Sequence, residues 1–354
     1  MKTVLIMAGG TGGHIFPGLA VADEMRAAGW DVTWLGARGG MEERLVPPRG
    51  YRGEWIRARA ARGKGWLQKL LLPANLLLSF WESARLIRRL KPDVVLGLGG
   101  YVAFPGGMMA SLLDRPLALH EQNAVAGLAN RVLARLGDKV MVAFPGALEG
   151  AEWTGNPVRA DISSLDLPEK RFKDRSGPLR LLVVGGSLGA QALNEMLPIA
   201  LSLLKEKIFV VHQAGEKHLE QLQSNYEKSG VQGELVTFID DMARRYAEAD
   251  LVICRAGAVT VAELAAGGLA SLLVPYPHAT DDHQTVNARF LSEKGAALLI
   301  PQSDLSPQKL AGIISALDRP QLLAMARKAR ALGKPDAARV VARRCIELAE
   351  ARAR

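Results

Sequence analysis

The sequence predicts an α/β protein built from two Rossmann-like domains, each a doubly wound parallel sheet. Short runs of Val, Ile and Leu alternate with helix-like stretches, which is the pattern of parallel sheets covered by helices. A glycine-rich turn follows an apolar run at Gly9, and a matching turn follows another at Gly185, about half the chain later. The 354 residues also exceed the size at which one hydrophobic core usually stops growing. We therefore expect two domains.

The apolar runs place the strands in order along the chain. In the first half we expect strands at 3–7, 32–35, 94–98, 117–120 and 139–142. In the second half we expect them at 179–184, 209–213, 234–238, 251–254 and 270–274. The polar, proline-containing stretch 155–178 is interpreted as the linker, so the domains are set at 1–158 and 159–335. A basic amphipathic helix over about 336–354 is expected to pack back on the first domain.

The two glycine-rich turns indicate phosphate chemistry. A strand that leads through such a turn into a helix presents backbone N–H groups and a positive dipole end. Alternatively, the glycines only permit a tight turn. The dinucleotide fingerprint fails because Ile15 stands where its third glycine would be, and no GxxxxGK[ST] or Asp-x-Asp motif occurs. These absences argue against an NAD enzyme, a P-loop NTPase and the usual metal chelation of a nucleotide sugar.

Positive charge is concentrated in one segment. The formal net charge is +9, and the segment 57–91 holds nine basic residues against the single acid Glu82. Apolar residues recur near helical spacing in the same segment, at Trp66, Leu70, Pro73, Leu77 and Trp81. This pattern predicts a surface that binds an anionic membrane. A buried amphipathic helix with a charged rim is the alternative, and no motif supports nucleic acid.

The compartment is predicted from the cysteines and from the absence of targeting signals. Cys254 and Cys345 are too few for a disulfide framework, which indicates a reducing environment. The short apolar start is interpreted as a strand and not as a signal peptide, and no apolar run reaches the roughly 20 residues of a membrane span.

Eight motifs distributed over both halves carry a family resemblance. They are GGTGGHIFPG at 9–18, GLGGYVAFPG at 97–106, HEQNAVAGLANR at 120–131, GNPVR at 155–159, GGSLGAQ at 185–191, FIDDM at 238–242, CRAGAVTVAE at 254–263 and DDHQTVNA at 281–288. In this order the motifs resemble the MurG family, whose enzymes transfer N-acetylglucosamine from UDP-N-acetylglucosamine to undecaprenyl-pyrophosphoryl-MurNAc-pentapeptide (lipid I), giving lipid II for peptidoglycan. The resemblance implies a GT-B fold with the two domains facing one cleft, and an inverting mechanism without bound metal or other cofactor. It also implies a peripheral enzyme on the cytoplasmic face of the bacterial inner membrane, where other cell-wall proteins are potential partners.

The resemblance also implies the site residues. Uracil would contact Arg159 and the backbone of Ile239. The ribose hydroxyls would contact Glu263, and the acetylglucosamine would contact Asn123 and either Gln284 or His283. The full donor set is Thr11, Gly12, Gly13, Asn123, Arg159, Ser187, Ile239, Ala258, Val259, Thr260, Val261, Ala262, Glu263 and Gln284. The acceptor set is Gly10, Gly13, Gly99, Gly100 and Tyr101.

We interpret the implied reaction as direct displacement at the anomeric carbon by the C4 hydroxyl of MurNAc. His14, just beyond the first glycine-rich turn, is the candidate general base, although a packing role on the following helix is the alternative. Arg255 is a candidate for stabilising the departing UDP. Other hypotheses are another UDP-N-acetylglucosamine-dependent GT-B enzyme or epimerase with a soluble substrate, a non-catalytic nucleotide-sugar-binding protein, or a serine hydrolase. The hydrolase would use Ser187 in its GxSxG motif with His278 or His283.

Overall fold

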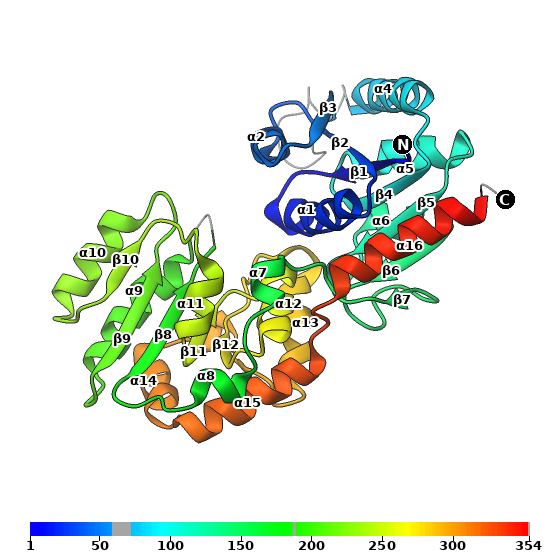
Figure 1. Ribbon diagram of the computed structural model, residues 1–354. Helices are drawn as coiled ribbons and strands as arrows, with labels where there is room; N and C mark the ends of the chain where they lie inside the picture. Colours follow the sequence, from blue (N-terminus) through cyan, green and yellow to red (C-terminus); the bar gives the residue numbers. More distant parts are fainter. Residues whose placement is uncertain (59–71, 187–188, 353–354) are drawn as a thin grey trace. The chain divides into compact units, whose positions relative to one another are not determined.

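A computed structural model describes residues 1–58, 72–186 and 189–352. The chain divides into two compact units. Unit 1 contains Met1–Arg159 and Asp336–Arg354, and unit 2 contains Ala160–Pro335. The chain therefore passes from one unit to the other twice, and the end of the chain belongs to unit 1 (Figure 1).

Unit 1 is built on a seven-stranded parallel sheet with the order β3-β2-β1-β4-β5-β6-β7. Its strands are β1 (Thr3–Ala8), β2 (Asp31–Ala37), β3 (Arg52–Ile56), β4 (Val94–Gly99), β5 (Leu117–Glu121), β6 (Lys139–Val142) and β7 (Glu152–Trp153). Its helices are α1 (Gly12–Ala27), α2 (Met41–Leu45), the 3₁₀ turn η1 (Pro47–Arg49), α4 (Leu72–Leu90), α5 (Ala103–Leu112), α6 (Leu128–Leu133) and α16 (Ala337–Arg352).

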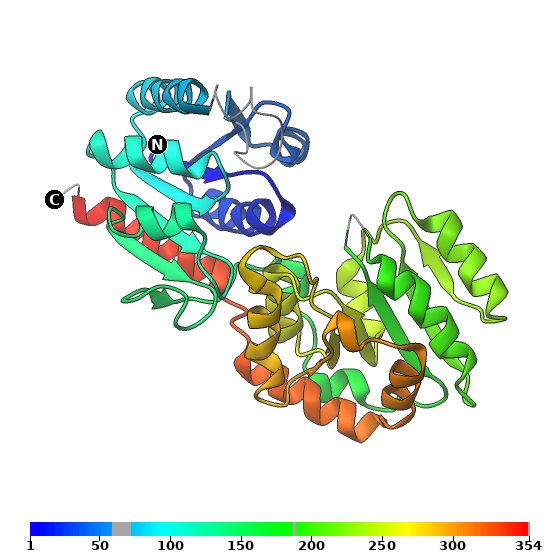
Figure 2. The ribbon, with the colours of Figure 1, turned by 180° about the vertical axis from the view of Figure 1, so that it is seen from behind.

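Helices cover both faces of this sheet, which explains why its strands are almost continuously apolar. On β1, Val4 and Ile6 join a core with side chains of α1 and α16, whereas Leu5 and Met7 join a second core with α4, α5 and α6. Successive side chains of a strand point to opposite faces, so one strand serves both cores. The helix α16, drawn in red beside the label C in Figure 2, packs against α1 and β4. It is an integral layer, because its Val341 and Cys345 are fully buried in the first core.

Unit 2 repeats the plan with a six-stranded parallel sheet, in the order β10-β9-β8-β11-β12-β13. Its strands are β8 (Leu179–Val184), β9 (Ile208–Gln213), β10 (Glu234–Val236), β11 (Leu251–Cys254), β12 (Ser271–Leu273) and β13 (Leu298–Leu299). Its helices are α7 (Ala160–Ser163), α8 (Pro168–Phe172), α9 (Gln191–Ser202), α10 (Leu219–Lys228), α11 (Met242–Glu248), α12 (Ala258–Gly267), η2 (Thr280–Asp282), α13 (His283–Ser292), η3 (Gln302–Asp304), α14 (Pro307–Ser315) and α15 (Arg319–Leu332).

The predicted fold class is confirmed, since both sheets are parallel and doubly wound and each begins its winding at a central strand. The interpretation of 155–178 as a linker needs correction. Most of this stretch lies in unit 2, where α7 packs against α12 and α8 against α15. Arg171 of α8 is buried and its guanidinium donates to the carbonyls of Gly267 and Gly268, which joins this stretch to the body of unit 2.

Candidate active site

The strand order of each unit reverses direction between two central strands, β1 and β4 in unit 1 and β8 and β11 in unit 2. In open α/β sheets, ligands bind at the carboxyl ends of the strands at this switch point. The predicted glycine-rich turns follow β1 and β8. The predicted residues Gly99 to Tyr101 lie at the carboxyl end of β4, and the helix α12 follows β11. The predicted site residues of each unit therefore gather largely at its own switch point.

In unit 1, the loops after β1 and β4 pack backbone against backbone. Gly100 has φ 80°, and a Cβ there would lie 2.2 Å from the carbonyl oxygen of Gly9. Gly99 has φ 101°, and its Cβ would lie 2.9 Å from Cε1 of His14. Only glycine combines this conformation with this approach. The structure thus brings His14, Gly99, Gly100 and the ring of Tyr101, which faces Gly10, into one cluster.

A buried carboxylate holds the first glycine-rich turn. Glu42 is fully buried, and its Oε2 accepts the Gly10 N–H at 3.1 Å while its Oε1 accepts the Ala37 N–H at 2.9 Å. The Gly10 N–H is therefore engaged within the protein. Thr11, the N-cap of α1, makes no side-chain cap, so the first turn of that helix carries the anion-binding potential of the loop.

His14 is the first member of a chain of side chains. Its Nδ1 lies 2.8 Å from Oε1 of Gln122. Nε2 of Gln122 lies 3.1 Å from Nδ1 of His120 and 2.9 Å from the His120 carbonyl oxygen, and Nε2 of His120 lies 2.9 Å from the carbonyl oxygen of Gly155. His120 and Gln122 are buried, and burial lowers the pKa of His120 to about 4. His120 is therefore neutral near pH 7. His14, at the other end of this chain of side chains, is only half-buried.

A second buried carboxylate shapes the loop that carries Asn123. Oε1 of Glu121 accepts the backbone N–H and the side-chain amide of Asn123, at 2.8 and 3.2 Å. Its Oε2 accepts the N–H of Gly127 and the amide of Asn130, at 3.2 and 2.8 Å. Four donors compensate the burial of this charge. Sequence reasoning selected Asn123 and overlooked Glu121, although the two lie in one motif.

In unit 2, the helix α12 begins with N–H groups that no side chain caps. Gly257 is its N-cap, and Ala258, Val259 and Thr260 form its first turn. Val261 is buried and donates its N–H to the Gly257 carbonyl oxygen at 2.9 Å. The predicted Ser187 lies outside the described residues. Arg159 is the last residue of the first segment of unit 1, and it is half-buried.

Glu263 lies on the same helix as these N–H groups, and Ala262 precedes it. Its side chain is mostly buried, with the residue 9% exposed, and Oε2 accepts the hydroxyl of the buried Tyr246 at 3.1 Å. Tyr246 belongs to α11, which follows the loop that holds the buried Ile239. Tyr246 thus fixes one oxygen of the carboxylate, a role that the sequence did not reveal.

The DDHQ loop has an unusual backbone. Asp281 and Asp282 adopt the left-handed conformation, at φ 53° and 49°. Gln284 directs its Oε1 to the backbone N–H of Tyr276 at 2.9 Å. The guanidinium of Arg255 donates to the carbonyls of Val274 and Pro275 and to Gln302, so much of its donor capacity is used within the protein.

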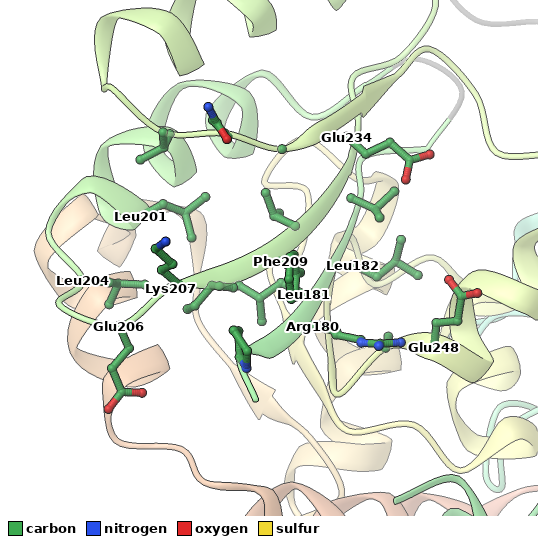
Figure 3. A pocket seen from close by; sticks show the side chains of 18 of the residues that line it. Arg180, Leu181, Leu182, Leu201, Leu204, Glu206, Lys207, Phe209, Glu234 and Glu248 are labelled. Carbon is green, nitrogen blue, oxygen red and sulfur yellow. The ribbon is translucent and has the colours of Figure 1, made fainter. Parts of the chain in front are cut away.

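A pocket of about 920 Å³ in unit 2 lies elsewhere. Arg180, Phe209 and Glu234 line it near the amino ends of their strands, at the sheet edge opposite the glycine-rich turn (Figure 3). It contains none of the predicted site residues. Across the residues that the structure describes, no group of three or more His, Cys, Asp and Glu side chains could hold a metal ion.

Two doubly wound parallel sheets with glycine-rich turns at their switch points define the GT-B class of glycosyltransferase. The crystal structure of VinC in complex with dTDP shares this fold, at a TM-score of 0.70 and 16% identity, covering 99% of this chain and 100% of that one. Family models described as the glycosyltransferase family 28 N-terminal domain and C-terminal domain match residues 4–142 and 180–341. The chain belongs to glycosyltransferase family 28.

Curated relatives match almost the whole chain. The UDP-N-acetylglucosamine--N-acetylmuramyl-(pentapeptide) pyrophosphoryl-undecaprenol N-acetylglucosamine transferase of Azoarcus sp. (strain BH72) is 62% identical over 354 residues, 99% of each chain. The protein of the same name from Cupriavidus necator is 59% identical over 350 residues, 98% of each chain. The crystal structure of MurG from Acinetobacter baumannii has a TM-score of 0.87 and 42% identity, covering 98% of this chain and all of that one. The resemblance predicted from the motifs is thereby confirmed.

Proposed function

We propose that this protein transfers N-acetylglucosamine from UDP-N-acetylglucosamine to the C4 hydroxyl of MurNAc in lipid I, producing lipid II and UDP with inversion at the anomeric carbon. The observation that carries the proposal is the full-length similarity to relatives named for this transfer, at 62% identity. The clusters at the two switch points support it, because one contains a candidate base and the other a candidate nucleotide site.

Unit 2 is proposed to hold the donor. The uncapped first turn of α12, at Ala258 to Thr260, suits the diphosphate, because its N–H groups and the helix dipole favour negative charge. Glu263 offers carboxylate oxygens to the vicinal ribose hydroxyls. Ile239 is proposed to present its backbone to the uracil, and Gln284 to contact the acetylglucosamine.

Unit 1 is proposed to hold the acceptor and to supply the base. The acceptor pyrophosphate binds at the loops of Gly13 and Gly99 to Tyr101. His14 removes the proton from the C4 hydroxyl as that oxygen forms its bond to the anomeric carbon. The bond from that carbon to the diphosphate breaks at the same time, and its electrons leave with UDP. A sugar hydroxyl is a weak nucleophile, and a positioned base typically accelerates such a step by roughly 10²- to 10⁴-fold.

The helix α4 supports a peripheral position on a membrane. Leu77 and Trp81 are 69% and 57% exposed, and they lie one turn apart on one face of the helix. Arg85 continues this face and places its guanidinium 5.6 Å from the Trp81 ring, and Arg88 is exposed beside it. Exposed apolar and basic residues together suit an anionic lipid surface on the cytoplasmic side. Trp66 and Leu70 lie outside the described residues, and no described helix is both long and apolar enough to cross a membrane.

The transfer is tested with labelled UDP-N-acetylglucosamine and lipid I. We expect label in a butanol-extractable product that requires lipid I. His14→Ala should lower kcat by about two to four orders of magnitude with little change in the dissociation constant of the donor. His14→Gln keeps a polar side chain and should be almost as inactive. Label transferred only to a soluble acceptor would contradict the proposed substrate, and a near-normal kcat in His14→Ala would contradict the proposed base.

A further inference from the structure

Two backbone carbonyl groups determine where the protons lie in the chain from His14 to Gly155. A carbonyl oxygen only accepts hydrogen bonds. The Gln122 atom that lies 2.9 Å from the His120 carbonyl oxygen must therefore be the amide nitrogen. The other end of that amide, which faces His14 at 2.8 Å, is then the oxygen. Because this oxygen also only accepts, Nδ1 of His14 must carry a proton.

The far end of the chain gives the same answer independently. The carbonyl oxygen of Gly155 requires a proton on Nε2 of His120, at 2.9 Å. A neutral His120 then has its lone pair on Nδ1, and this atom accepts the second N–H of the Gln122 amide at 3.1 Å. Both carbonyls therefore select one orientation of the amide. His120 and Gln122 are 0% and 1% exposed, so water does not compete for these groups.

We infer that Gln122 and His120 are positioning residues that hold His14 in the neutral tautomer with its proton on Nδ1 and its lone pair on Nε2. This inference rests on the proposed role of His14 as the base. Nε2 is the ring nitrogen that the chain leaves available, and it would receive the proton of the acceptor hydroxyl. Gly99 supports the arrangement, because its backbone closes on the Cε1 side of the ring.

The chemistry of the chain limits what happens to that proton. After Nε2 takes it, the imidazolium still donates its Nδ1 proton to the neutral Gln122 oxygen. An amide oxygen is far less basic than imidazole, so the proton stays on His14 and leaves through Nε2. The chain therefore orients the base and does not relay protons to His120.

The tautomer is measured directly by nitrogen NMR of histidine-labelled protein above pH 8. The protein has six histidines, and the His14 signals are assigned as those that disappear in His14→Gln. We expect a protonated, pyrrole-like Nδ1 and an unprotonated, pyridine-like Nε2. In Gln122→Leu we expect a mixture of His14 tautomers. We also expect kcat to be roughly ten- to hundredfold lower and KM for the donor to be unchanged, because losses of this size follow the removal of a hydrogen bond that selects a histidine tautomer. His14→Ala combined with Gln122→Leu should be no slower than His14→Ala alone.

Asn194→Leu is the matched control, because Asn194 is another buried amide that contacts a buried histidine, His212 in unit 2. It should lower stability and leave the His14 signals unchanged. A proton on Nε2 of neutral His14 in the wild type, or an unchanged tautomer and kcat in Gln122→Leu, would overturn the inference even if His14 is the base. Conversely, an active His14→Ala enzyme would show that His14 is not the base, whichever ring nitrogen carries its proton. The wild-type spectrum decides the orientation even where Gln122→Leu fails to fold.

Discussion

Glu263 should determine whether the protein distinguishes a ribonucleotide from a deoxyribonucleotide. The residue is 9% exposed, and one oxygen of its carboxylate already accepts from Tyr246. Hydrogen bonds to a charged group contribute roughly 1.5–3 kcal/mol. At about 1.4 kcal/mol for each factor of ten, Glu263→Ala should weaken the binding of UDP by roughly 10- to 150-fold. Wild-type protein should also bind UDP more tightly than 2′-deoxy-UDP by a factor in the lower part of this range.

Calorimetric titration of both nucleotides into wild type and variant measures this directly. In Glu263→Ala the two affinities should become nearly equal, because the group that reads the ribose is gone. Tyr246→Phe is the matched control, since it keeps the carboxylate and removes only the hydroxyl that orients it. It should lower UDP affinity by about 1 kcal/mol or less. Equal binding of UDP and 2′-deoxy-UDP by the wild type would refute the ribose role, and thermal unfolding of each variant identifies losses caused by misfolding.

Three further predictions concern the membrane surface, the loops and the last helix. Trp81→Ser and Arg88→Glu should each reduce sedimentation with anionic vesicles. Binding of the wild type to the vesicles should weaken as the salt concentration rises. Unchanged sedimentation of both variants would exclude this surface as the membrane-binding site. Gly100→Ala should destabilise the protein to urea by more than about 1 kcal/mol, because the site combines positive φ with a backbone contact. Hydrogen bonds from Arg344 lower the pKa of Glu152 from 4.5 to about 2. Because the pKa is lower in the folded state, ionised Glu152 contributes to the free energy of unfolding above pH 4.5, and this contribution is lost as the pH falls towards 2. Wild type should therefore be more stable than Glu152→Gln at pH 7 and equal to it near pH 2.

The central strands could be predicted from the sequence because both faces of each are buried. The predicted ranges 179–184 and 251–254 coincide with the central strands β8 and β11, and 139–142 coincides with β6, next to the edge strand β7. The missed strands lie towards the sheet edges or are very short. Arg52–Ile56 mixes charged, small and aromatic residues and is largely half-buried, so no apolar run marks it. Leu298–Leu299 has only two residues, too few for any periodicity.

The site could be predicted only as far as its motifs extend. The glycine turns, His14 and Glu263 stand beside strands and helix starts, where phosphate and sugar chemistry is expected. The supporting residues carry no such mark. Glu42 binds a turn some thirty residues earlier in the chain, and Tyr246 approaches Glu263 from another helix. Contacts of this kind depend on tertiary packing, which spacing alone does not encode. The ligand contacts of all the predicted site residues stay predictions, and Ser187 lies outside the described residues.

The position of α16 affects the order in which the protein folds during its synthesis. Domains that form from continuous chain usually fold in the order in which they leave the ribosome. Unit 1 cannot do so, because Val341 and Cys345 complete the core beside β1 and are translated after unit 2. At a synthesis rate of about 5–20 residues per second, that core stays incomplete for roughly 10–40 s after Arg159 is made. The continuous unit 2 can fold during this interval, so the domain whose chain begins first is finished last.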